Sequence, residues 1–205
     1  MVTENVSDCL RNLMSRGYTV INGIESGEYL NISESLGTVF DVQEISYLPG
    51  KNAKLHSCQA MSLHSDHPDA NFVSWYCVSQ SDIGGESLLL DFQDIAAHLS
   101  EKQLDDLRQV EVKFPTLEHK GFAVTTLLSK AGLYYSGWLI DPVFRGATKP
   151  CVLEVFEHLL EALPKISIRL EIGQSLIINN KRMLHGRSAF QGEGSRRSLI
   201  RHWIQ

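Results

Sequence analysis

The sequence predicts a mostly β protein with flanking helices, built as an antiparallel sandwich or jelly roll. Many short β-type segments are separated by glycine and polar turns, whereas helical periodicity occurs in only a few places. This pattern is typical of antiparallel sandwiches and jelly rolls. A doubly wound sheet is disfavoured, because it needs regular alternation of strands and helices and a glycine-rich phosphate turn, for which GGES at residues 84–87 is too short.

The individual elements follow from the spacing of apolar residues and from turn residues. Helices are expected at residues 6–17, 27–36, 92–107 and 151–163, with Gly37 as the stop of the second. Strands are expected at residues 18–23, 38–42, 44–48, 60–64, 72–79, 86–91, 110–114, 122–128, 133–140, 166–172, 175–179 and 198–204.

Length and composition indicate an ordinary globular protein. The 205 residues, 43% of them hydrophobic and 21% charged, are expected to form a single domain over residues 1–205. A net charge of −5 without a basic face argues against nucleic acid or a membrane surface as partner. No apolar run is long enough to span a membrane, and the N-terminus lacks a signal-peptide pattern. Four cysteines without a C-x-x-C pair are expected to be reduced thiols in the cytoplasm.

Residues 62–71, SLHSDHPDAN, combine histidines and aspartates just after an apolar segment. If that segment is a strand, His64 and Asp66 project from the same face and offer two metal ligands. H-x-D also occurs by chance, so a plain polar turn is the alternative.

A second histidine and an arginine strengthen the metal interpretation. His185 follows the apolar segment SLII and the polar turn NNKR, and Arg197 is expected inside the last strand. A buried arginine needs an anion, and its planar fork suits a carboxylate. Two histidines and one carboxylate with open positions are the ligand set of non-haem Fe(II) oxygenases.

At these residues the chain resembles the Fe(II)/2-oxoglutarate-dependent oxygenases, in the branch of taurine dioxygenase and clavaminate synthase. The matching segments, in chain order, are RGYTVINGI with ESLGTVF, LHSD, GGESLLLD, and NNKRMLHGRSAF with RRSLIRHW. They span most of the chain. The resemblance implies a double-stranded β-helix, that is, a cupin-like jelly roll, with Fe(II), 2-oxoglutarate and dioxygen as its requirements.

The resemblance also implies roles for individual residues. His64, Asp66 and His185 would bind iron, and Arg197 would bind the distal carboxylate of 2-oxoglutarate with the hydroxyl of Ser87. Arg201 matches an arginine that often meets an anionic group of the substrate. A carboxylate rather than a small residue at position 66 implies hydroxylation, or the related desaturation or ring closure, instead of halogenation.

The substrate implied is a small polar molecule, an amino acid or a derivative, free or attached to a carrier protein. The chain departs from the family pattern at two points, of which the first concerns orientation of the site and the second the size of the substrate. The turn before the second histidine reads Asn179-Asn180 where the family usually has D-N, and the short spacing from His64 to His185 implies trimmed insertions over the pocket. The pocket is then either more open or completed by a partner subunit, so a homo-oligomer is one option.

Several residues keep two interpretations at this stage. His67 is either a substrate contact or a solvated loop residue, and Arg187 is either close to the site or part of a surface ion pair. Tyr134 and Trp138 either line the pocket mouth or pack in the core, whereas Trp75 is expected in the core. Other functions are a jelly-roll sensory module that binds metal and 2-oxoglutarate without turnover, and a zinc hydrolase on the same ligands.

Overall fold

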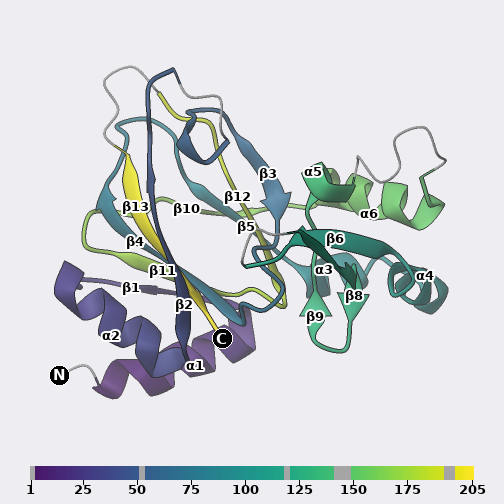
Figure 1. Ribbon diagram of the computed structural model, residues 1–205, viewed down its shortest axis with the longest axis horizontal. Helices are drawn as coiled ribbons and strands as arrows, with labels where there is room; N and C mark the ends of the chain where they lie inside the picture. The colour runs from purple at the N-terminus through teal and green to yellow at the C-terminus, as the bar shows by residue number, and fades with distance from the viewer. Residues whose placement is uncertain (1–2, 51–53, 118–120, 141–148, 192–196) are drawn as a thin grey trace.

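The computed structural model describes residues 3–50, 54–117, 121–140, 149–191 and 197–205. Two antiparallel sheets form its centre (Figure 1). The five-stranded sheet has the order β1 (Tyr18–Ile21), β11 (Ser175–Asn179), β4 (Phe72–Ser79), β13 (Ser198–Ile204) and β2 (Val39–Ser46). The four-stranded sheet has the order β10 (Ile166–Ile168), β5 (Ser87–Asp91), β12 (Met183–Arg187) and β3 (Met61–His64).

One hydrophobic core lies between the two sheets. Leu176 and Val73 of the larger sheet, both fully buried, share a cluster with Leu89 of the smaller sheet. Strands that alternate between two packed sheets are the mark of the jelly roll, so the predicted fold class is confirmed.

Two helices cover the outer face of the larger sheet. The helix α1 (Thr3–Arg16) packs on β1 and β11, and α2 (Ser26–Leu36) packs on β4 and β13. Their apolar faces form a second cluster that contains Leu13, Tyr29 and Ile32. Both helices match the sequence predictions, because their amphipathic spacing has this one face to cover.

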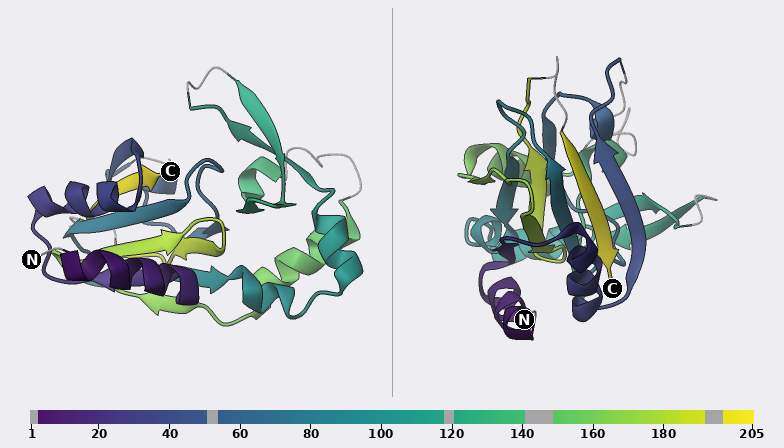
Figure 2. Two further views of the ribbon diagram at one scale, coloured as in Figure 1. Left: turned by 90° about the horizontal axis from the view of Figure 1, so that it is seen from below. Right: turned by 90° about the vertical axis from the view of Figure 1, so that its left-hand side faces the viewer.

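The middle of the chain forms a separate layer at the opposite end of the sandwich from α1 and α2 (Figure 1). Around a third hydrophobic cluster it contains α3 (Phe92–Ala96), α4 (Glu101–Leu107), the hairpin β6 (Glu111–Pro115) and β7 (Phe122–Thr126), the hairpin β8 (Leu128–Ser129) and β9 (Gly132–Leu133), α5 (Gly137–Ile140) and α6 (Cys151–Ala162). Figure 2 shows the β6–β7 hairpin, in teal, projecting from the body. A 3₁₀ turn, η1 (Lys54–His56), precedes β3.

Several predictions of elements are wrong in detail. Residues 122–128 are not one strand, because β7 ends at Thr126 and Leu128 begins β8. Residues 38–42 and 44–48 are one strand, β2, and the single helix expected over residues 92–107 is two, because Ser100 caps a new helix. Residues 133–140, expected as one strand, consist of the last residue of β9, a short loop and α5. The strand expected at residues 166–172 ends at Ile168. The strand β12, which carries His185, is absent from the predicted set.

Two further expectations concern thiols and membranes. All four cysteines are free thiols, as expected for reduced residues. Among the described residues, none of the helices has the length and apolar character to cross a membrane.

Candidate metal centre and its two pockets

The two histidines of the candidate site come from neighbouring strands. His64 is the last residue of β3 and pairs directly with His185 in β12. Their ring centroids lie 4.2 Å apart. Both side chains are buried, with exposed fractions of 4% and 8%. Pairing in the sheet therefore fixes the relative position of the two imidazoles.

Asp66 lies in the loop after β3, so the expectation that it shares a strand face with His64 is wrong. The loop is held by side chains from elsewhere: the backbone N–H of Asp66 donates to Oδ1 of Asn180 at 2.9 Å. Nη1 of Arg201 donates to Oδ1 of Asp66 at 3.1 Å. Asn180 lies in the turn between β11 and β12 and Arg201 lies in β13, and together these two contacts hold the loop and its carboxylate beside the histidines.

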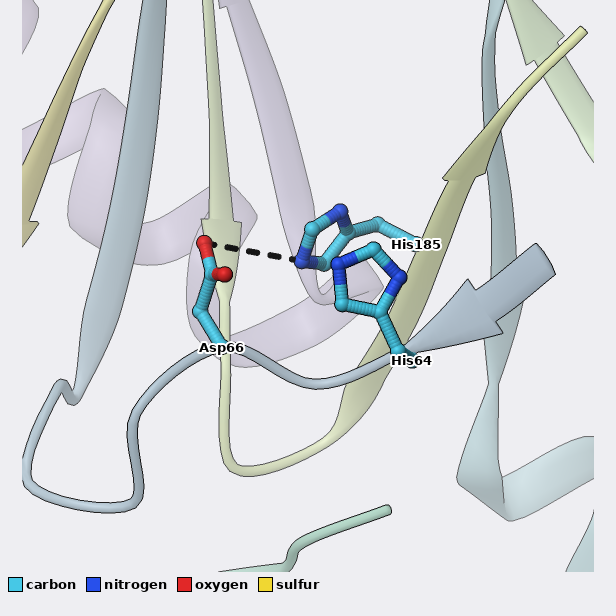
Figure 3. Close-up of side chains that lie close together, drawn as sticks. All are labelled: His64, Asp66 and His185. Atoms are coloured by element: carbon cyan, nitrogen blue, oxygen red, sulfur yellow. Dashed lines mark ion pairs between the residues drawn. The ribbon is translucent and has the colours of Figure 1, made fainter. Parts of the chain in front are cut away.

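The three side chains converge on one point (Figure 3). One ligand atom from each of His64, Asp66 and His185 lies within 4.8 Å of the others, and all three residues are buried. Nε2 of His185 and Oδ2 of Asp66 are 3.7 Å apart, and neither has a hydrogen-bond partner among the described residues. Buried polar atoms without partners are costly, and a bound cation would satisfy both.

The protonation states also suit a metal. Nδ1 of His64 lies 2.9 Å from the backbone carbonyl of Ser62, which can only accept, so Nδ1 carries a proton and the neutral ring has its lone pair on Nε2. Burial, aided by the neighbouring His64, lowers the pKa of His185 to about 3 and keeps it neutral. Burial opposes ionisation of Asp66, but the surrounding charges, that of Arg201 first, outweigh burial and lower the pKa of Asp66. Two neutral imidazoles and a carboxylate are the donor set that a divalent iron site needs.

An inner cavity of about 50 Å³ lies between the sheets on one side of this cluster. Its charged and polar lining comes from strands or strand ends: Ser87 on β5, Arg187 on β12, and Arg197 and Arg201 at the start of and within β13. Apolar side chains such as Leu89 and Leu199 complete the wall. The cavity is thus a cationic recess in an apolar core.

A larger outer pocket of about 380 Å³ lies on the other side of the cluster. It is lined by β2, by the loop of Asp66, by the segment after β6 and by α5 with the residues before it. His64 and Arg201 line both spaces, so the ligand cluster forms the partition between them. A molecule in the outer pocket and another in the inner cavity would both touch the same ion.

No family model matches the chain. It is 27% identical over 160 residues to the taurine hydroxylase-like protein SAT17 of Stachybotrys chartarum, an alignment that covers 69% of this chain. The chain spans about 41% of the length of that curated relative.

Solved structures match a larger share of this chain. An asparagine oxygenase in complex with Fe(II), hydroxyasparagine and succinate superposes with a TM-score of 0.75 at 15% identity, covering 98% of this chain and 79% of that one. The non-haem iron oxygenase OrfP, with Fe and α-ketoglutaric acid, gives 0.74 at 20% identity over 98% and 80%. The PvcB protein of Pseudomonas aeruginosa gives 0.69 at 17% identity over 98% and 80%. The chain has the fold of the non-haem iron oxygenases.

Of the residues expected at the co-substrate site, Arg197 and Ser87 both line the inner cavity. Arg197 is buried, but it lies one residue before β13 and not inside the strand as expected. Arg201 is four residues further along and lines the same cavity, so the two arginines do share a face. Besides Asp66, Arg201 contacts Gln43 at 2.6 Å and Asp41 at 3.6 Å, both on β2.

His67 and Arg187 are buried, so the solvated and surface interpretations of them are wrong. The backbone N–H of Asp69 donates to Nδ1 of His67 at 3.2 Å, which leaves the proton of the neutral ring on Nε2. Burial lowers the pKa of His67, and the residue lines the outer pocket. Arg187 lines the inner cavity.

Other residues of the site were missed or left open from the sequence. Asn180 is 1% exposed and donates from Nδ2 to the carbonyls of His67 and Ala70 while it accepts from Asp66, so it holds the whole ligand loop. The Asn179-Asn180 pair in the sequence indicated a turn here, but it did not indicate that Asn180 anchors the loop. Tyr134 and Trp138 line the outer pocket, and the Trp138 ring lies 4.6 Å from that of His64. Trp75 is buried as expected, yet it also lines the inner cavity.

Proposed function

We propose that this protein is a Fe(II)/2-oxoglutarate-dependent dioxygenase that hydroxylates a small polar substrate, an amino acid or a derivative. The observation that carries the proposal is the buried cluster of His64, Asp66 and His185 between a cationic cavity and an open pocket. Residues 1–205 would act as one catalytic domain.

His64, Asp66 and His185 would hold the iron, and the two pockets beside them would give the 2-oxo acid and the substrate access to it. Iron in this setting supplies the redox chemistry that couples conversion of 2-oxoglutarate and dioxygen into succinate and carbon dioxide to insertion of one oxygen atom into a substrate C–H bond. The protein orients the ligands: Asn180 fixes the loop, Arg201 fixes the carboxylate and the Ser62 carbonyl fixes the His64 tautomer.

The inner cavity supports a role in binding the 2-oxo acid. Arg197 is buried at its wall together with the hydroxyl-bearing Ser87, and a guanidinium with a hydroxyl donor suits a carboxylate. The apolar walls around them keep water away and strengthen that contact. Arg197 and Ser87 would therefore bind the distal carboxylate of 2-oxoglutarate.

The outer pocket supports a role in binding the substrate. Nε2–H of His67 is a donor on its wall, and Arg201 lies at its junction with the inner cavity. Because Arg201 already pairs with Asp66, it would position this ligand as well as meet an anionic group of the substrate. Trp138, beside His64, would cover the reacting carbon and exclude water.

Similar proteins support an amino-acid substrate. The asparagine oxygenase structure contains a hydroxyasparagine, and an OrfP structure contains (3S)-hydroxy-L-Arg with Fe and succinate. Attachment of the substrate to a carrier protein, a homo-oligomer and a cytoplasmic location are further parts of the proposal; the free thiols fit the last of these.

Succinate production tests the function directly. The protein with Fe(II), 2-oxoglutarate and oxygen should form succinate above background when it meets its substrate in a panel of free and carrier-linked amino acids. Without oxygen, Fe(II) and 2-oxoglutarate should give the weak visible charge-transfer band of a chelated 2-oxo acid, and Asp66→Ala should lose it. No band in the wild-type protein would contradict the proposal.

A further inference from the structure

A second arginine accompanies Arg197 in the inner cavity. Arg187 is 6% exposed and lines the cavity from β12, two residues after the ligand His185. In the pairing of β12 with β5, Arg187 lies directly opposite Ser87. Directly opposed residues project from the same face of a sheet, so this guanidinium and this hydroxyl share one wall.

Arg187 and Arg197 also share an aromatic neighbour. The Cζ atom of Arg187 lies 5.0 Å from the ring centroid of Phe190, and that of Arg197 lies 5.7 Å from it. Burial, and after it the charge of Arg187, lowers the pKa of Arg197 to about 10. The two guanidinium groups lie beside the same ring and line the same cavity, so an anion in that cavity would be attracted by both.

The orientation of Arg187 is fixed by the backbone. Its Nη2 donates to the carbonyls of Ser57 at 2.8 Å and Gln59 at 2.7 Å, in the segment that precedes β3. A guanidinium is a rigid planar fork with five donors, so two bonds through one nitrogen set the direction of the whole group. Arg187 is therefore already oriented as part of the cavity wall.

We propose that Arg187 joins Arg197 and Ser87 in binding the distal carboxylate of the 2-oxo acid, which makes the cavity selective for a dicarboxylate co-substrate. Arg187 then acts as a specificity-determining residue. The inference rests on the proposed function, because it assigns a residue to the co-substrate of that same site.

Binding of two 2-oxo acids tests the inference. Titration calorimetry of the Fe(II)-loaded protein without oxygen would compare 2-oxoglutarate with 2-oxopentanoate, which has the same carbon chain but no distal carboxylate. Arg187→Met keeps the length of the side chain without the charge. It should weaken 2-oxoglutarate binding about tenfold or more, since it removes a charge-assisted contact, and leave 2-oxopentanoate unchanged. Arg187→Lys keeps the charge without the fork and should show the same change in preference to a smaller degree.

Arg169→Met is the matched control. Arg169 also donates to loop carbonyls, those of Ser81 and Gly84, but it is not part of the cavity wall. The Arg169→Met variant should bind 2-oxoglutarate and 2-oxopentanoate with the same affinities as the wild type. Equal weakening of both acids in Arg187→Met would show that the residue only supports the loop, and an unchanged preference in both Arg187 variants would likewise overturn the inference. A wild-type protein that binds neither acid would instead contradict the proposed function.

Discussion

The two spaces beside the ligand cluster are built in different ways. The polar lining of the inner cavity comes from strands paired on both sides, β5, β12 and β13, and from Arg197 at the edge of the last one. The outer pocket is lined mainly by β2 at the edge of its sheet, by loops and by the short helix α5, with Arg201 and Trp203 from β13. The inner cavity is about 50 Å³ and has core residues in its wall, and the outer pocket is about 380 Å³ with polar and aromatic walls.

This difference matches the two molecules that the proposed reaction needs, a co-substrate that is always the same and a substrate that differs between enzymes. Side chains on strands inside a sheet are held by ladders on both edges and change position only when the fold changes. Loops can change sequence and length at little cost to stability. The inner cavity therefore suits a co-substrate of fixed structure, and the outer pocket suits adaptation to a particular substrate. Variants on each side should affect different ligands.

The largest loss of activity is expected from a change in the ligand cluster that lies between the two spaces. Asp66→Ala removes the only anionic ligand of the cluster, so metal affinity should fall by about 100-fold or more, with loss of succinate formation. Metal content after dialysis measures this. Asp69→Asn, a mostly exposed carboxylate three residues on in the same loop, is the control and should bind metal normally. Equal metal binding in wild type and Asp66→Ala would contradict the site.

Asn180→Ala tests whether the loop needs its anchor. The variant loses three buried hydrogen bonds, so the free energy of unfolding should fall by about 2–4 kcal/mol and metal affinity should fall with it. Urea denaturation and metal titration measure the two effects. Asn179→Ala is the matched control, because Asn179 is half-buried and, among the described residues, its side chain accepts only from the N–H of Lys181. Similar losses in both variants would show that the turn, and not Asn180, holds the loop.

Ser87→Ala tests the inner cavity. Loss of one hydroxyl donor should raise the dissociation constant of 2-oxoglutarate about fivefold to tenfold and leave the KM for the substrate unchanged. Ser87→Thr keeps the hydroxyl and should bind as the wild type does. A change in the substrate KM with unaltered 2-oxoglutarate binding would reverse the assignment of the two spaces.

Asp41→Asn tests the outer pocket and should have the smallest effect. Asp41 is partly exposed and lies 3.6 Å from Arg201, so its charge is screened by solvent. The KM for the substrate should change by about twofold to fivefold, while 2-oxoglutarate binding stays the same. Steady-state kinetics with each ligand varied in turn measures this, and an effect on 2-oxoglutarate alone would contradict it.

Regular elements were predictable where one periodicity dominated. The helices α1, α2 and α6 and the strands β4, β11 and β13 lie where the sequence placed them. The break between α3 and α4 could have been predicted from the S-x-x-Q pattern of Ser100 and Gln103, which form a capping box with both reciprocal bonds. A strand was predicted over residues 133–140 because Tyr134 and Tyr135 favour strands. In the structure these two side chains pack in the core beside α6 and the loop of Asp66.

The strand β12 shows why some elements escape a local pattern. It is short and contains Gly186, which disfavours a strand. In the structure the glycine is required, because a Cβ there would lie 2.6 Å from the carbonyl oxygen of Met61 on the neighbouring β3. Such close approach of two backbones cannot be read from either segment alone.

The sequence by itself predicted the fold class, because hydrophobic alternation is a local signal, and the H-x-D, histidine and arginine segments with the family resemblance that they carry indicated the candidate ligands. Only the tertiary structure decided how Asp66 reaches the histidines, through Asn180 and Arg201 and not through a shared strand face. It also decided that Arg187 faces the inner cavity and that His67 is buried. Both outcomes depend on contacts between segments more than a hundred residues apart, which no local pattern encodes.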